Sequence, residues 1–479
     1  MREGRPGRPG GRRHADPPGR PPHRRGHRGV SDPDDSLLRL ARGLVERADA
    51  GEQLEVTIGE SRRTTVRVHG GEVESFTSAT SHGAGIRVIR DGREGFAHAG
   101  SLDPEVLDDT LAEARDNAAF ATPDEHVGLV EPDGVVAIEV DHWRDESLAM
   151  AEPDKIARAV DLERRVRAGD PRVRSVRTAI WSDGASRVAL ASTAGLALAT
   201  RGTSCSLSVS AIAGEGDDTA TGAGVDAARA PGDLDDDAVV ADAVHRATEL
   251  LGGRPVASQR LTLVVEPRLA AMLLGIVAGT LTGDAVLKGR SPFADRRGDA
   301  IASPVLRLVD DPTDLRSLGA DSHDGEGLAT RRNVLVDDGV LRGFLYDGTT
   351  GRRAGTASTA SAVRGSRSLP SPGVQVLVVE PGARSADELL ADVELGFAVR
   401  SFNGLHSGVN PVSGDFSVGA EGRMIRGGAL AEPVREVTVA GSLQRMLLDL
   451  REVGADIEWL PSGAGMASLV IDDVSLGGR

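Results

Sequence analysis

The side chains that could bind a metal ion or transfer a proton gather in two short turns of this sequence. They are Asp321, His323 and Asp324 in the first turn, and His406, Asn410 and Asp415 in the second. Imidazole and carboxylate groups can hold a divalent cation, but the same residue types are common in solvent-exposed turns. We interpret the first turn as a solvated loop and keep the second group as candidate binding residues, with packing or capping inside the turn as the alternative.

Other kinds of catalytic site find no support in the sequence. Ser401, Ser407 and Ser413 have no evident His and Asp partners, which a serine triad needs. The Gly-rich stretch 214–224 lacks the Gly-Lys-Ser/Thr ending of a phosphate-binding loop. The single cysteine, Cys205, lies in an alternating run that is typical of a small strand residue and excludes an intrachain disulfide. We therefore assign no catalytic residue and no metal ligand in this chain.

Charge and hydropathy patterning narrow the class of protein. The net charge is −16, and because residues 1–30 carry nine Arg against Glu3 and Asp16, the remainder carries about −23. An acidic chain opposes direct contact with nucleic acid, which needs a basic surface. The longest uncharged run, Leu269–Gly283, has 15 residues, fewer than the roughly 20 that span a membrane. With no apolar segment of a signal peptide near the N-terminus, we expect a cytoplasmic protein without membrane partners.

The length of 479 residues predicts two or three domains. Residues 1–35 are rich in Arg, Pro and Gly and are predicted to be disordered. An N-terminal α+β domain is expected over residues 36–125 and a middle α+β domain over 126–255. A β-rich, barrel-like domain with packed helices is expected over 256–479. The fold class is α+β, with mainly antiparallel sheets.

Local patterns place the main elements of these domains. Apolar spacing predicts helices at 104–120, 153–167, 238–251 and 267–283. Four short strands are predicted at 54–58, 64–68, 72–76 and 84–89, and Asp91-Gly92 predicts a hairpin turn. The Gly- and Asp-rich segment Gly214–Asp237 is interpreted as a mobile loop. Its acidic residues lack the spacing of a calcium-binding EF-hand.

Several ordered runs together resemble one known family. Ser401–Gly441 places turn residues at Asn410-Pro411, Ser413-Gly414 and Gly427-Gly428 between short apolar runs, and it resembles the third domain of the TldD/PmbA family. Further similar runs, in the same order, are Gly83–Val88, Asp91–Ala97, Asp324–Gly327, Asp338–Leu341 and Pro433–Gly441. The resemblance extends from about Ser36 to the C-terminus. It implies a fold shared with zinc metallopeptidases.

The sequence departs from the catalytic branch of that family at its zinc site. TldD-type members carry His-Glu-x-x-x-His on the helix after the first strand of the third domain, and a Cys near the C-terminus. The corresponding positions here hold Leu274, Gly275 and Gly279, and residues 273–284 contain no His, Glu or Cys. The segment Asp456–Gly465 offers only Asp456 and Glu458. Because zinc needs nitrogen or sulfur ligands and a Glu to deprotonate bound water, no catalytic residue carries over.

This departure, and the run Gly408–Ser417, resemble the TldE (PmbA) branch. The resemblance implies a non-catalytic subunit that pairs with a zinc-bearing TldD-like chain, itself holds no cofactor, and presents extended peptide to its partner's site. His406, Asn410 and Asp415 are the candidate peptide contacts. Two alternatives stay open: an independent peptidase with a divergent metal site around His323 or His406, and a regulatory protein-binding module linked to DNA gyrase modulation.

Overall fold

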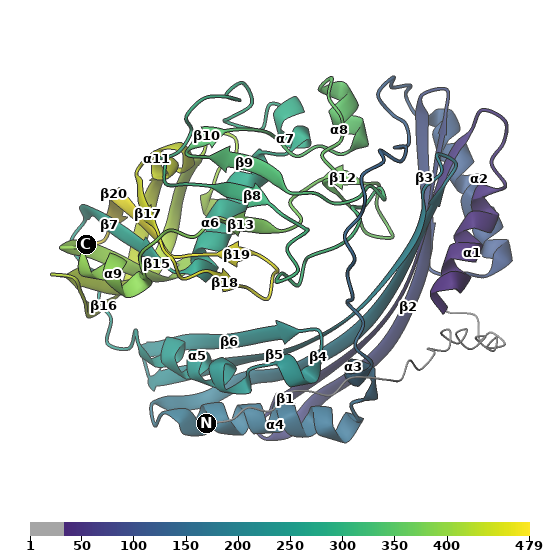
Figure 1. Cartoon of the computed structure of the whole chain (residues 1–479). Coiled ribbons are helices and arrows are strands. Elements are labelled where there is room, and N and C mark those ends of the chain that lie inside the picture. The colour runs from purple at the N-terminus through teal and green to yellow at the C-terminus, as the bar shows by residue number, and fades with distance from the viewer. Residues whose placement is uncertain (1–32) are drawn as a thin grey trace, which may run out of the picture.

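The computed structural model describes residues 33–479 (Figure 1). It has two parts: a long, curved antiparallel sheet with helices on its outer side, and a compact C-terminal unit on the inner side of the curve. This confirms the expected α+β fold with mainly antiparallel sheets. The predicted disordered segment 1–35 lies outside the described residues, except that helix α1 begins at Pro33. Within residues 33–479, no helix combines the length and the apolar character needed to cross a membrane.

The curved sheet has the strand order β3-β2-β1-β4-β5-β6. Its strands are β1 (Gln53–His69), β2 (Glu72–Arg90), β3 (Arg93–Ala99), β4 (Val173–Ser192), β5 (Ala197–Glu215) and β6 (Asp218–Ala228). Strands from the predicted N-terminal and middle domains therefore form one sheet, joined where β1 pairs with β4. The predicted domain boundary near residue 125 stays a prediction.

Four helices cover the convex face of this sheet: α1 (Pro33–Val45), α2 (Pro104–Phe120), α4 (Glu152–Gly169) and α5 (Asp236–Thr248). Alternation along β5 explains the arrangement, because Cys205, Leu207 and Val209 are buried beneath the helices. Two glycines let the layers approach closely. A Cβ on Gly95 would lie 2.0 Å from the Ala114 carbonyl oxygen of α2, and one on Gly222 would lie 2.1 Å from the Ala247 nitrogen of α5.

Two predictions about this sheet were wrong. The segment Gly214–Asp237 is not a loop, because Asp218–Ala228 forms β6 and pairs with β5 along its whole length. The four short strands predicted between residues 54 and 89 are two long strands, β1 and β2. Polar residues such as Arg62 stay in the strand because its neighbours Thr80 and Ala185 continue the ladder on both sides.

The C-terminal unit contains a closed five-stranded barrel of β16-β15-β14-β7-β20, which β16–β20 pairing completes. Its strands are β7 (Gln259–Val265), β14 (Leu395–Asn403), β15 (Asp415–Arg426), β16 (Ala429–Ser442) and β20 (Leu469–Gly477), and β17 (Leu450–Val453) pairs outside the ring. Helix α6 (Pro267–Thr280) packs its apolar side into the largest core cluster of the chain's described part. The expected barrel-like C-terminal domain is confirmed.

A second sheet of this unit, β10-β9-β8-β13-β19-β18, lies beside the barrel. Its strands are β8 (Leu308–Asp310), β9 (Asn333–Asp337), β10 (Val340–Leu341), β13 (Leu377–Val379), β18 (Glu458–Trp459) and β19 (Gly465–Met466). Short elements complete the chain: α3 (Asp145–Ala149), α7 (Gly283–Leu287), α8 (Gly348–Arg353), α9 (Ala386–Ala391), α10 (Leu405–Gly408), α11 (Leu443–Leu448), and the pair β11 (Ala362–Val363) and β12 (Ser371–Pro372).

Candidate functional site

Helix α6 is the element that would carry zinc ligands if the chain were a catalytic member of the family it resembles. Leu274 is 1% exposed and belongs to the core. Gly275 and Gly279 lie on the exposed side of the helix, and a Cβ added to either would meet no atom within 4 Å. The three positions therefore offer one buried hydrocarbon and two bare backbone sites, none of which can bind a metal ion.

The surroundings do not replace the missing ligands. Among residues 33–479 that the structure describes, no three His, Cys, Asp or Glu side chains converge in a way that could hold a metal ion. In the segment that lacks the family's cysteine, Asp456 is engaged by Ser468, since it accepts hydrogen bonds from the Ser468 backbone N–H and hydroxyl. The donor set does not fit zinc, so we derive no chemistry through a metal in this chain.

The inner side of the curved sheet, here called the concave face, faces the C-terminal unit. Strand registers place small hydroxyl side chains in rows across it, for example Thr77, Thr65, Ser182 and Ser206 on adjacent strands. Hydroxyl residues in these rows include Ser61, Thr65, Ser75, Thr77, Ser81, Thr178, Ser182, Ser186, Thr200, Ser204, Ser206, Ser208, Ser210, Thr219 and Thr221. All of these residues are exposed or half-buried. The exposed Val188 and Val225 lie on the same face, so it combines rows of hydroxyl groups with scattered apolar side chains.

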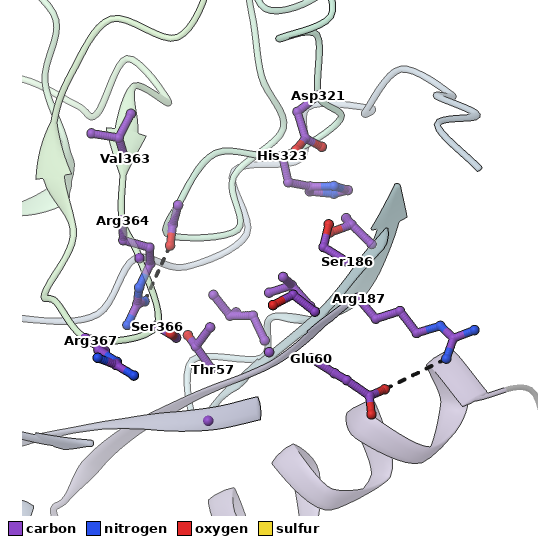
Figure 2. A pocket seen from close by; sticks show the side chains of 18 of the residues that line it. Thr57, Glu60, Ser186, Arg187, Asp321, His323, Val363, Arg364, Ser366 and Arg367 are labelled. Atoms are coloured by element: carbon purple, nitrogen blue, oxygen red, sulfur yellow. Dashed lines mark hydrogen bonds and ion pairs between the residues drawn. The ribbon is translucent and has the colours of Figure 1, made fainter. Parts of the chain in front are cut away.

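A cavity of about 480 Å³ lies where the concave face meets loops of the C-terminal unit (Figure 2). The sheet contributes Thr57, Ser81 and Ser186 to its wall, and the loops contribute His323 and the segment 363–367. Figure 2 shows His323 above the strand that carries Ser186, with Arg364 and Ser366 on the opposite loop. The lining mixes hydroxyl, imidazole and guanidinium groups, which can bind polar parts of an extended chain.

A buried network of charges fixes the loops of the cavity to the sheet. Arg87 on β2 is 2% exposed, and its Nε donates to Glu94 at 2.6 Å. Its Nη1 lies 3.7 Å from an oxygen of Glu326, which comes from a loop of the C-terminal unit. In return Arg364 from that unit donates to Glu55 on β1 at 2.5 Å. Two reciprocal pairs therefore join the sheet to the C-terminal unit, which holds the cavity in shape.

The network of Arg87, Glu94, Glu326, Arg364 and Glu55 is called the charged junction below. Two acids in or beside it have shifted pKa values. Burial raises the pKa of Glu326 to about 8, opposed by the backbone N–H of Gly348, which donates to its Oε2 at 2.7 Å. Burial also raises the pKa of Asp324 to about 6, although three backbone N–H groups of its own loop and β11 donate to its carboxylate. Both acids are nearly inaccessible to solvent, so we assign them a positioning role.

The predicted binding residues lie in the turn between α10 and β15. Asn410 accepts backbone hydrogen bonds from Val412 and Ser413 through its Oδ1, and Asp415 accepts one from the Ser413 hydroxyl at 2.9 Å. These contacts are internal to the turn. The His406 side chain lies outside the described residues. A role in peptide binding stays a prediction for all three.

His323, the centre of the other candidate turn, lines the cavity. Its Nδ1 lies 2.9 Å from the hydroxyl of its neighbour Ser322, and burial lowers its pKa. Asp324 points into its own loop and is occupied by backbone donors. The structure thus places His323 and Asp321 at the cavity, but it does not bring them together with a third ligand.

Comparison with known proteins agrees with this architecture. Family models match three successive segments: PmbA/TldA metallopeptidase domain 1 at residues 54–118, the central domain at 145–251 and the C-terminal domain at 258–478. The chain belongs to the PmbA/TldD family. It is therefore metallopeptidase-related, as its resemblance to that family implied.

Individual PmbA/TldD relatives cover nearly the whole chain. Metalloprotease PmbA of Escherichia coli O157:H7 is 25% identical over 93% of this chain and 95% of its own length. TldE of Thermococcus kodakarensis has a TM-score of 0.81 at 25% identity, covering 93% of this chain and 99% of its own. A TldD homologue of Haemophilus influenzae is 31% identical, but over only 41% of this chain and 44% of its own length. The long matches thus include proteins of the PmbA and TldE names.

The charged junction was missed at the sequence level, although its signal was present. The family-like runs Gly83–Val88 and Asp324–Gly327 meet there in space. A Cβ on Gly85 would lie 2.8 Å from the Ser366 carbonyl oxygen, and one on Gly325 would lie 3.0 Å from that of Ala362. Glycines at both positions allow these backbones to approach closely.

Proposed function

We propose that this chain is a TldE-type, non-catalytic subunit that pairs with a zinc-bearing TldD-like chain in the cytoplasm and forms part of a chamber for peptides or unfolded proteins. The partner would supply zinc and cleavage, and this chain would supply wall and peptide contacts. The proposal rests on one observation above others. The three family domains are all present, yet the ligand positions on α6 hold Leu274, Gly275 and Gly279.

The concave face supports the wall role. Small hydroxyl groups on β1, β2, β4 and β5 offer hydrogen bonds without deep pockets that would select one side chain. An extended chain presents regularly spaced N–H and C=O groups, which suit such a surface and the strand edges beside it. The expected preference is therefore for extended, unfolded segments over particular sequences.

Zinc content and peptide hydrolysis test the proposal together. The chain purified alone should hold far less than one zinc per molecule and cleave no unstructured peptide. Mixing it with the TldD-like chain of the same organism should give a stable complex with activity and about one zinc per complex. Stoichiometric zinc with cleavage in this chain alone would replace the proposal with an independent peptidase. Recovery of a topoisomerase instead of a TldD-like chain from lysate would favour the regulatory alternative.

A variant pair tests the role of the concave face. Ser204→Trp places a bulky side chain on an exposed position of that face. The matched control Arg164→Trp lies on α4, where the Arg164 side chain is 68% exposed on the outer side of the sheet. The assembled pair with Ser204→Trp should lose peptide turnover while the control keeps it. Equal turnover in both variants would argue against a substrate-facing surface.

A further inference from the structure

The outer edge of β2 is unpaired over half of the strand's length. Strand β3 pairs with β2 only from Ala84 to Arg90. From Glu72 to His82, no other strand in residues 33–479 pairs on that side, and every residue in this segment is exposed on both faces. Val73 and Phe76 are 41% and 37% exposed. This segment, Glu72–His82, is called the β2 edge below.

The β2 edge lacks the features that normally block edge-to-edge pairing. Natural edges carry Lys, Pro or bulges, because a bare row of N–H and C=O groups is a template for another strand. The run Ser75–Ser81 contains no charge and no Pro, and its pairing with β1 is regular. The register shift of the β1–β2 ladder falls just before it, where Glu74 is the extra residue. A regular, uncharged edge of seven residues is therefore open to a further strand.

We propose that two copies of this chain pair antiparallel through their β2 edges, with Ser78 of one copy opposite Ser78 of the other. This register keeps the two concave faces on the same side of a continuous sheet. It opposes Ser75 to Ser81 and Phe76 to Thr80, pairs whose members share a face because side chains alternate with period two. It uses the whole regular run.

Charge complementarity favours a second copy as the occupant. The same register places Glu74 of each copy opposite His82 of the other. A carboxylate therefore faces an imidazole, which can donate a hydrogen bond, at both ends of the dimer interface. No like charges are opposed between these ends. Phe76 gains cover from the neighbouring copy, and aromatic side chains opposite β-branched ones are favourable cross-strand pairs.

Dimerisation through the β2 edge does not depend on the proposed role in peptide cleavage. Pairing through the β2 edge leaves α6 free, whereas Ser81 and His82 at one end of the edge also line the cavity, so two copies would meet at the cavity rim. Dimerisation can be tested on this chain alone, and its outcome does not depend on whether a partner supplies zinc and peptide cleavage.

A single-cysteine crosslink tests the register. The native Cys205 is 2% exposed, so Ser78→Cys adds the one accessible thiol. Directly opposed residues of an antiparallel pair lie about 4.5–5.5 Å apart between Cα atoms, within the range of about 4.4–6.8 Å that a disulfide bridges. Mild oxidation of the full-length variant should yield a covalent dimer on a non-reducing gel. Ser204→Cys, exposed on the same sheet but three strands away, is the matched control and should run as an uncrosslinked monomer on the same gel.

Sedimentation velocity gives an independent measurement. The wild-type chain should sediment as a dimer, and Ser78→Lys, which opposes two like charges at the centre, should weaken dimerisation about tenfold. Its circular dichroism spectrum should not change, because Ser78 is exposed in the single chain and its replacement leaves the fold intact. A monomeric wild type, with Ser78→Cys crosslinking no more than Ser204→Cys, overturns the inference. Loss of a co-purified TldD-like chain in Ser78→Lys, with the wild type alone monomeric, would assign the edge to that partner and also overturn it.

Discussion

Replacing Glu326 by Gln should flatten the dependence of stability on pH. Burial raises the pKa of Glu326 from an ordinary 4.5 to about 8, so the folded chain keeps a proton that the unfolded chain loses above pH 4.5. The stability linked to this group is fully present below pH 4.5, is lost as pH rises toward 8, and stays low above pH 8. A glutamine cannot ionise and keeps an oxygen for the Gly348 N–H.

The size of the effect follows from the shift. A difference of about 3.5 pKa units at about 1.4 kcal/mol each sets a ceiling of about 5 kcal/mol for the ionised form. With an unfolding entropy of about 2.1 cal/mol/K per residue, a chain of this length shifts by about 1 °C per kcal/mol. Between pH 5 and pH 8.5, the melting temperature of Glu326→Gln should therefore fall by up to about 4 °C less than that of the wild type, since part of the effect lies outside this window. Asp324 and Asp310, whose pKa values burial raises to about 6 and about 7, keep part of the slope.

The assay is a series of thermal melts of wild type and variant from pH 5 to pH 9 at constant ionic strength. Glu125→Gln is the matched control, because the Glu125 side chain is 89% exposed and its replacement should leave the slope unchanged. Curves of Glu326→Gln that run parallel to the wild type across this range would refute the reasoning. A second refuting result is a Glu326→Gln variant whose melting temperature is far below that of the wild type at pH 5. At that pH the wild-type carboxyl is already neutral in the folded chain, so the substitution should cost little.

Three further results are expected. Lys155→Met should lower the free energy of unfolding by about 3–5 kcal/mol, measured in melts, because the buried Asp183 loses the ammonium group 2.8 Å away. The double variant Lys155→Met/Asp183→Asn should be destabilised by less than the sum of the two single variants. Gly222→Ala should abolish soluble protein, because its Cβ would lie 2.1 Å from a nitrogen of α5, whereas Gly279→Ala on open helix surface should stabilise by up to about 1 kcal/mol. Cys205 should react with a thiol reagent only after unfolding, since burial raises its pKa to about 12; rapid reaction in the native state would contradict its placement.

The sequence predicted those elements whose signals are local. Helix α2 runs from Pro104 to Phe120, the bounds that its apolar spacing and initial Pro indicate. Asp91 and Gly92 both have positive φ, 52° and 69°, as the predicted tight hairpin requires. The sequence of α6 could also be compared with the family motif directly, because that motif lies within a few residues on one helix.

Features that depend on tertiary contacts were not predictable in this way. Gly222 and Gly224 looked like loop residues, but they lie in β6, where α5 packs too closely for a side chain. The charged junction joins residues as distant as Glu55 and Arg364, 309 positions apart. No local period reveals such a pair, although the glycines that flank it belong to the runs that indicated the family.

The pairing of β1 with β4 has a consequence for the nascent chain. Residue Thr57 meets its partner Leu190 only after the ribosome has made α2, α3 and α4. At about 5–20 residues per second, the 133 positions from Thr57 to Leu190 take about 7–27 s to be synthesised. During that interval the β1–β2 hairpin is exposed along the side that β4 later covers, with Val56 and Ile58 not yet enclosed. We expect a chaperone that binds unfolded chains to engage this hairpin during translation, because the first strand synthesised waits for the fourth before its second edge is paired.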